Sequence, residues 1–87
     1  MKNFAEKILT IREYFHLTQK ELADITGFSR GTIILWEQKK REPRGYKALM
    51  FLSSSLNIDI AYFLADEVDK KYLMQSSGKF PGLSGNI

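Results

Sequence analysis

The 87-residue sequence has no cysteine and one histidine, His16. Without cysteine it can form no disulfide scaffold, zinc–thiolate site or thiol nucleophile, and this composition fits a reducing compartment. A single histidine argues against a histidine-based metal site or a Ser-His-Asp triad. No apolar run approaches the roughly 20 residues that span a bilayer, and the first residues lack the apolar segment of a signal peptide. We therefore expect a cytoplasmic protein with no membrane segment, no metal and no cofactor.

The chain is also too short for a large two-domain enzyme with a cleft between its domains. Hydrophobic residues make up 44% of it and aromatic residues 13%, which suffices for one core. A domain of this size buries only roughly 60–65% of the surface that its unfolded chain exposes, so one small unit is expected. The sequence shows no glycine-rich phosphate loop and no activated nucleophile, and we expect that the protein is not an enzyme.

The net charge of +3 is distributed unevenly along the chain. Residues 29–47 carry six basic side chains against two acidic ones, Glu37 and Glu42. Residues 59–71 carry four acidic side chains against two basic ones. This asymmetry is expected if one face of the protein meets a polyanion such as nucleic acid and another face does not. The six basic residues are Arg30, Lys39, Lys40, Arg41, Arg44 and Lys47.

The spacing of apolar residues predicts helices. Between residues 3 and 15, and again between 45 and 56, apolar side chains recur every three or four positions. No segment alternates with period two over enough residues to predict a sheet. We therefore expect an all-α fold with five helices. The first four cover residues 3–15, 19–25, 30–38 and from 45 or 46 to 56, and Asp59 can cap a fifth that runs through Leu64.

Several of these helix ends carry local signals. Thr18 and Glu21 have the spacing of a capping box at a helix start. Gly27 is suited to end that helix with a positive φ, and Ser29 is suited to cap the next one. Asn57 suits the end of the fourth helix.

The last part of the chain is predicted to be a tail to this domain. We expect a DNA-binding domain over residues 1–65 and a tail over 66–87. Residues 66–74 could extend a helix or form a short one. Residues 75–87 are rich in glycine, serine and proline, which predicts a flexible segment.

Residues 19–38 describe two short helices joined by a glycine-containing turn, with a basic segment directly after the second helix. This is the organisation of a helix-turn-helix, in which the first helix crosses the DNA backbone and the second enters the major groove. Ala23 must be small because the two helices pack closely there. Phe28, Ile33 and Trp36 are expected to fill the space behind them.

Several motifs recur at fixed spacings between about residues 4 and 65. They are Thr18–Ala23, Gly27–Arg30, Ile33, Trp36–Glu37, Arg41–Pro43 and Leu56–Asp59. Together they resemble the lambda-repressor-like (Xre-type) helix-turn-helix family. The resemblance implies a five-helix domain that binds double-stranded DNA, usually as a two-fold dimer on near-palindromic sites. It also implies that Arg12 and Glu37 form a structural ion pair and do not contact DNA.

By position in this family, the second helix of the motif reads the bases. Arg30 is the best candidate for a bidentate contact to guanine, which contributes about 1–3 kcal/mol of discrimination. The sequence departs from the family pattern because Gly31 offers no side chain and Ile34 and Leu35 are apolar. Either one or both of these apolar residues touch thymine methyl groups, or one turns inward and its neighbour is exposed. The base-reading candidates are Ser29, Arg30, Gly31, Thr32, Ile34 and Leu35.

A second group of residues is placed to contact the DNA phosphates. Gln19 follows the Thr18 cap at a helix start, where the alternative is a solvated side chain. The run Lys39–Arg41 follows the DNA-reading helix, where the alternative is a solvated turn. Arg44 could reach a phosphate or an edge of the minor groove, and the helix start after it could bind phosphate more weakly. The phosphate candidates are Thr18, Gln19, Lys39, Lys40, Arg41, Arg44, Tyr46 and Lys47.

The apolar residues that exceed what the core requires predict a homodimer. We expect its interface on the fourth and fifth helices, clasped by residues 72–74. The candidates are Met50, Phe51, Tyr62, Phe63, Tyr72, Leu73 and Met74.

The sequence therefore predicts a sequence-specific, double-stranded DNA-binding transcriptional regulator, and more specifically a repressor that occupies a promoter. Two alternatives stay open. Residues 36–48 also resemble the DNA-binding part of some antitoxins, in which a tail such as 67–87 would cover a toxin protein and order on binding. The chain could otherwise be a protein-interaction module that kept the fold and lost DNA binding. A fold alone does not establish a function, so the basic residues around the DNA-reading helix are the independent support for the first interpretation.

Overall fold

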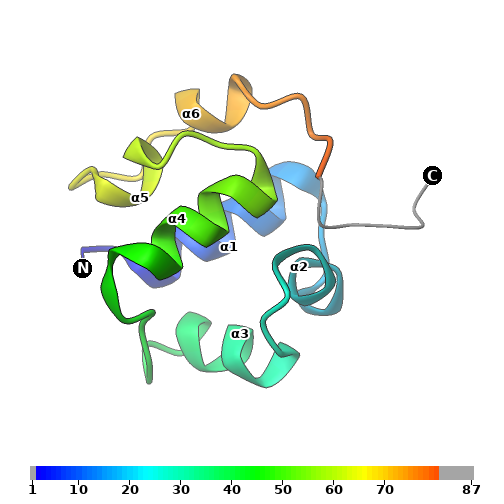
Figure 1. Cartoon of the computed structure of the whole chain (residues 1–87), viewed down its shortest axis with the longest axis vertical. Helices are drawn as coiled ribbons and strands as arrows, with labels where there is room; N and C mark the ends of the chain where they lie inside the picture. Colours follow the sequence, from blue (N-terminus) through cyan, green and yellow to red (C-terminus); the bar gives the residue numbers. More distant parts are fainter. Residues whose placement is uncertain (1, 81–87) are drawn as a thin grey trace.

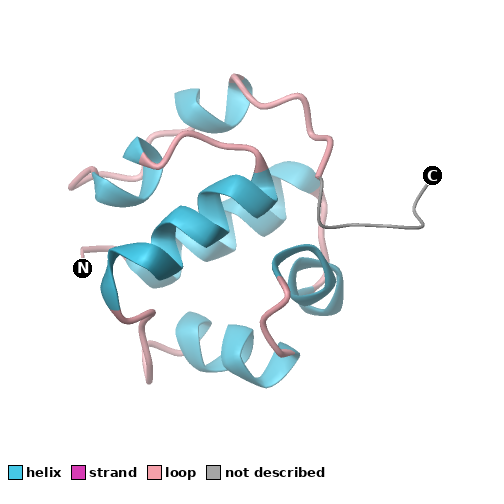
Figure 2. Cartoon of the chain, viewed as in Figure 1, coloured by secondary structure: helices cyan, strands magenta, loops and turns pink. Residues whose placement is uncertain are grey.

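The computed structural model describes residues 2–80, and every regular element within this range is a helix (Figures 1 and 2). The predicted all-α fold is confirmed. The five predicted helices are present, and a sixth short helix lies where the sequence allowed one. The helices are α1 (Phe4–Phe15), α2 (Gln19–Thr26), α3 (Arg30–Glu37), α4 (Gly45–Leu56), α5 (Ala61–Leu64) and α6 (Lys71–Met74).

The long helices α1 and α4 lie in the middle of the molecule and separate its two ends. In Figure 1, α2 and α3 lie on one side of α4 and α1, and α5 and α6 lie on the opposite side. The helix α3 packs against α1 and α2, whereas α5 packs against α1 and α6. One buried cluster contains apolar side chains from all six helices, and Trp36 is 2% exposed within it, as the sequence predicts. Both ends are therefore anchored on one core.

The local signals for α2 and α3 form as predicted. The Glu21 backbone N–H donates to Thr18 Oγ1 at 3.0 Å, and the Thr18 backbone N–H donates to Glu21 Oε1 at 2.8 Å. Gly27 ends α2 with a φ of 80°. The Thr32 backbone N–H donates to Ser29 Oγ at 3.1 Å, which caps α3. Each of these contacts spans three residues or fewer, so the chain sets the ends of the two helices locally.

The other helix ends differ slightly from the expectation. Asn3 has a φ of 58° and precedes α1, whereas the prediction placed it inside the helix. Asp59 lies just before α5 as the sequence predicts for a cap, and its Oδ1 accepts the Ala61 backbone N–H at 2.9 Å. Asn57 ends α4 in the left-handed conformation with a φ of 56°, as predicted.

The segment after α5 packs against the core through several side chains. Leu73 of α6 is fully buried, and the Phe80 ring lies edge-on to the Phe15 ring with centroids 5.1 Å apart. The flexible segment predicted over residues 75–87 therefore has a packed residue at position 80. The rest of that prediction, from residue 81 onward, lies outside the described residues.

Burial corrects the predicted dimer surface. Tyr62, Phe63 and Leu73 are at most 1% exposed, so these three of the seven apolar candidates belong to the core. They fill the space between α1, α5 and α6, which the sequence could not show because these short helices lack a periodic stripe of their own. Met50 and Phe51 on α4 are about half exposed.

Candidate nucleic-acid interface

The helices α2 and α3 pack against each other across the short turn that contains Gly27. Ala23 of α2 and Ile33 of α3 are buried at this contact. The Phe28 ring lies 4.8 Å from the Trp36 ring, centroid to centroid, and holds the turn against the core. Close packing of these apolar groups fixes the direction in which α3 projects.

One face of α3 is open to solvent along its amino-terminal half. Ser29, Arg30 and Gly31 are exposed, and a Cβ at Gly31 would meet only Ser29 Oγ, at 3.9 Å. The hydroxyl groups of Ser29 and Thr32 lie 2.9 Å apart and are hydrogen-bonded to each other. The guanidinium of Arg30 is therefore the longest donor group that this part of the helix presents.

The two apolar residues of α3 do not divide into one buried and one exposed side chain. Ile34 and Leu35 are both half-buried, and the inward position on this helix is taken by Ile33, which is fully buried. This differs from the alternative in which one side chain turns inward and its neighbour is exposed. Both side chains keep some exposed surface, and their contact with thymine methyl groups stays a prediction.

Arg12 of α1 and Glu37 at the end of α3 form a bidentate ion pair. Arg12 Nε donates to Glu37 Oε2 at 2.7 Å, and Arg12 Nη2 donates to Oε1 at 3.0 Å. The two side chains are 23% and 8% exposed. These hydrogen bonds raise the pKa of Arg12 above its usual value, although burial acts in the opposite direction. The pair joins the carboxyl-terminal end of α3 to α1.

Gln19 completes this network. Its Nε2 donates to Glu37 Oε1 at 2.9 Å, so one carboxylate oxygen accepts from α1 and from α2. A phosphate contact through the Gln19 amide would compete with this bond. The Gln19 side chain also lines a hollow over the start of α2, together with Arg12, Thr18, Lys20 and Arg30.

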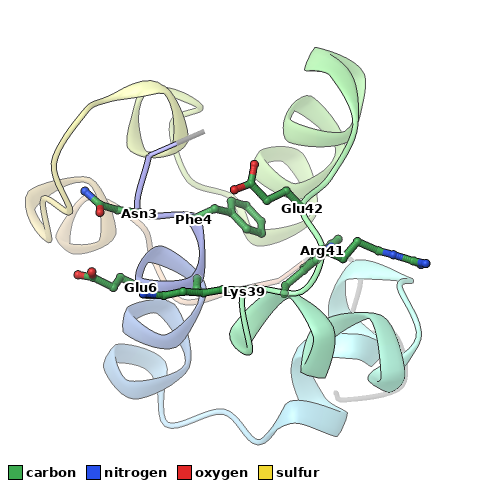
Figure 3. A pocket seen from close by; sticks show the side chains of 8 residues that line it. Asn3, Phe4, Glu6, Lys39, Arg41 and Glu42 are labelled. Carbon is green, nitrogen blue, oxygen red and sulfur yellow. The ribbon is translucent and has the colours of Figure 1, made fainter.

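The basic segment after α3 does not point in one direction. Lys39 has a φ of 63°, and Figure 3 shows its side chain extending toward α1 on the side of Glu6. The same view shows Arg41 pointing away from that side. Lys40, Arg44 and the residues that begin α4 are exposed. Arg41 and Arg44 line a hollow together with Thr32 of α3, whereas Lys39 is turned toward α1.

Sequence reasoning missed one buried cation, Lys7. It is fully buried, and its Nζ donates to the backbone oxygens of Phe63, at 3.0 Å, and of Ala65. Burial lowers the pKa of Lys7, and the nearby Asp66 carboxylate partly opposes this effect. A signal existed in the sequence, because Lys7 stands three residues after Phe4 and one before Ile8, on the apolar stripe of α1.

The part of the chain that the structure describes was also searched for other sites. It contains no group of three or more His, Cys, Asp or Glu side chains placed to hold a metal ion. Among its helices, the longest of which have 12 residues, none is long and apolar enough to cross a membrane.

A helix-turn-helix family model matches residues 8–63, which is more than half of the chain. The chain belongs to the lambda-repressor-like (Xre-type) helix-turn-helix family. A helix-turn-helix relative from Bacillus subtilis (strain 168), an uncharacterized HTH-type transcriptional regulator named YqaE, is 32% identical over 76 residues. This alignment covers 87% of the present chain but 65% of the relative. The match includes α2, α3 and α4. The helix-turn-helix of the family therefore corresponds to α2 and α3, and α3 is the helix whose amino-terminal half is open to solvent.

Proposed function

We propose that this chain is a sequence-specific, double-stranded DNA-binding transcriptional regulator, and that it represses transcription by occupying a promoter in the cytoplasm. The observation that carries the proposal is the open amino-terminal half of α3, held by packed α2 and surrounded by exposed basic side chains. A rigid helix with a free guanidinium suits readout of base edges in the major groove. The name of the Bacillus subtilis relative agrees with a regulator and not an enzyme.

The base-reading role falls to the residues at the start of α3. Arg30 would donate hydrogen bonds to guanine. The exposed parts of the half-buried Ile34 and Leu35 side chains would touch thymine methyl groups. Gly31 leaves room for the backbone to approach the groove closely. Ser29 and Thr32 are hydrogen-bonded to each other, so their hydroxyl groups would contribute less discrimination than Arg30.

The phosphate-contacting role falls to the basic residues on both sides of α3. Lys40, Arg41 and Arg44 are exposed and would neutralise backbone charge without reading sequence. Gln19 would present its backbone N–H, at the first position of α2, to a phosphate, because helix starts favour anions. Thr18 would support this contact by capping the helix, since its own backbone N–H already donates to Glu21 Oε1. Lys39, Tyr46 and Lys47 would contribute at the edge of this surface.

Selection from random duplex DNA tests this proposal. At about 150 mM salt, a specific regulator should recover a near-palindromic site that it binds at least about 10³-fold more tightly than a scrambled duplex. Near-palindromy would follow if two copies bind related by a two-fold axis. Recovery of no common site, with weak and strongly salt-dependent binding to all duplexes, would contradict sequence-specific regulation.

A further inference from the structure

The open half of α3 has few side chains that can read bases through hydrogen bonds. Residues 29–36 include no Asn or Gln, which read adenine, and no Asp or Glu, which read cytosine. The hydroxyl groups of Ser29 and Thr32 are bonded to each other at 2.9 Å. Arg30 is therefore the one side chain of this segment that suits a bidentate contact, and the base that matches it is guanine.

The polar residues that end α3 do not change this conclusion. Both carboxylate oxygens of Glu37 accept hydrogen bonds from Arg12, and the Glu37 side chain is 8% exposed. Gln38 is exposed, but it stands beyond the last turn of the helix, about two turns away from Arg30. The base next to the guanine must therefore be read without a hydrogen bond from α3.

Ile34 and Leu35 place apolar surface beside Arg30. Residues four apart lie above one another on a helix, so Ile34 stands in one row with Arg30, and Leu35 stands in the adjacent row with Gly31. A helical side chain leans over the turn that precedes it. Leu35 therefore leans over Gly31, where even an added Cβ would meet only Ser29 Oγ, at 3.9 Å. Both apolar side chains are half-buried and keep exposed surface next to the guanidinium.

The base edges of the major groove carry one kind of apolar group, the methyl group at C5 of thymine. 5-Methylcytosine has the same group at the same position, whereas cytosine and deoxyuridine lack it. On one strand, the C5 position of a pyrimidine lies next to the O6 and N7 edge of a guanine that follows it. A guanidinium with apolar surface beside it matches these two neighbouring groups together.

We propose that Arg30, Ile34 and Leu35 together read a two-base step in which a C5-methylated pyrimidine precedes guanine. Thymine and 5-methylcytosine both satisfy the first position of this step. Methylation of a cytosine at this position therefore strengthens binding, so the protein responds to the methylation state of its DNA site. This proposal deepens the proposed DNA-binding function and rests on it.

Two pairs of duplexes test the proposal, and the members of each pair differ by one methyl group. At one such step of the selected duplex, the first pair has thymine or deoxyuridine opposite adenine. The second pair has 5-methylcytosine or cytosine opposite guanine. The wild type should bind the methylated member of each pair about fourfold more tightly, as expected for one buried methyl group. Equal dissociation constants within either pair in fluorescence anisotropy, or a selected duplex without a pyrimidine–guanine step, would overturn the proposal.

Leu35→Ala tests whether α3 carries this preference. The ratio of affinities within each pair should fall from about four toward one, because the methyl group loses its contact. A loss of folded protein alone would weaken both members of a pair equally and leave the ratio unchanged. Ile34→Ala is a second variant, so the test does not depend on the folding of one protein. Wild-type ratios in both variants would overturn the assignment to these side chains.

Leu64→Ala is the matched control for these two variants. Leu64 is 52% exposed on α5, at the end of the molecule opposite α3, and the substitution removes the same atoms as Leu35→Ala. It should keep the wild-type ratio in both pairs. A ratio near one in Leu64→Ala would contradict a preference that depends on contacts of α3.

The four duplexes also separate this proposal from the function on which it rests. Tight binding to the selected duplex with no effect of the methyl group would overturn the methyl readout and leave sequence-specific DNA binding in place. Binding to all four duplexes that is as weak as binding to a scrambled duplex would contradict the DNA-binding function itself.

Discussion

Two cations of α1 hold opposite ends of the molecule, and they do so by different means. Arg12 meets a carboxylate from α3, so its charge is neutralised by another side chain. Lys7 donates to backbone oxygens at the end of α5. Its hydrogen bonds to Glu37 raise the pKa of Arg12, whereas burial lowers the pKa of Lys7. The comparison teaches that α3 is fixed by a charge pair, and α5 by an ammonium group inserted into the core.

The two ends also differ in what holds their helices. The caps of α2 and α3 come from neighbours in sequence, such as Thr18 with Glu21. The four-residue helices α5 and α6 are too short to be stable alone. They depend on contacts from distant residues: the Asn3 side-chain amide donates to the Asp66 backbone oxygen at 2.8 Å, across 63 positions. Breaking one α1 contact at a time should therefore affect one end more than the other.

The largest effect is expected from Glu37→Ala. The pair is partly buried, and removing the carboxylate leaves the Arg12 guanidinium without its partner, which should cost about 3 kcal/mol of unfolding free energy, the low end of the range for a buried pair. Gln19 would lose its acceptor as well. Urea denaturation measures the change, and Glu67→Ala is the control because Glu67 is exposed and should change stability by less than about 0.5 kcal/mol. Similar stability of both variants would contradict the importance of the Arg12 pair.

Lys7→Met should act at the other end of the molecule. Two backbone oxygens would lose a charged donor inside the core, at a cost of about 1.5–3 kcal/mol. Amide hydrogen exchange should show faster opening of residues 61–74 than of α3, because these short helices lose their anchor. Lys70→Met, at an exposed position, is the control. Faster exchange confined to α3 would contradict the division into two ends.

The proposed function of the α3 end can be tested with two substitutions, each of which removes one positive charge. Arg30→Ala should cost about 1–3 kcal/mol on the selected duplex and little on scrambled DNA, because a base contact carries the sequence information. Lys40→Ala should weaken binding to both duplexes and reduce the salt slope by about one unit. Fluorescence anisotropy over a salt series measures both quantities. Equal losses on both duplexes for Arg30→Ala would contradict its base-reading role.

The smallest effect is expected from Tyr62→Phe. The Tyr62 hydroxyl donates to the Lys7 backbone oxygen at 2.6 Å, and its loss should cost about 1 kcal/mol. Burial raises the pKa of Tyr62 above its ordinary value of 10.0. Above pH 10 the unfolded chain therefore loses a proton that the folded protein keeps, so this group makes the wild type less stable as pH rises.

Tyr62→Phe removes this dependence. Burial of Lys7 acts with the opposite sign, since its lowered pKa makes stability rise as pH approaches 10.5. The difference in unfolding free energy between wild type and Tyr62→Phe isolates the tyrosine. It should shrink between pH 9 and pH 11 by more than the error of paired denaturation curves, and a constant difference would contradict the burial of an un-ionised Tyr62.

The sequence was sufficient for the parts of the fold that depend on local chemistry. The caps at Thr18, Gly27, Ser29 and Asn57 bond to residues at most four positions away, so these helix ends could be assigned from local sequence alone. The burial of Lys7 could not be assigned in this way, because its acceptors lie 56 and 58 positions away. A lysine on an apolar stripe can be predicted to be buried only when the backbone oxygens that would accept its hydrogen bonds are known.

For the candidate site, too, the sequence predicted what depends on local pattern and not what depends on distant contacts. The residue set around α3 followed from the motif, but the directions of its side chains did not. The bond between Gln19 and Glu37 depends on how α2 lies against α3, and the turn of Lys39 depends on how α1 lies beside the segment after α3. The burial of Phe63 and Leu73 likewise depends on the packing of two short helices, which no periodic pattern marks.

The most direct test of the whole account is a titration of the protein with its selected duplex, in which NMR measures the chemical shifts of the backbone amides. We predict that the largest changes lie at residues 18–20, 29–35 and 39–44, and that α5 and α6 change little. This result would place DNA at the α3 end of the molecule. Changes concentrated on α5 and α6, or absent throughout the described chain at saturating duplex, would contradict the assignment of α3 as the DNA-reading helix.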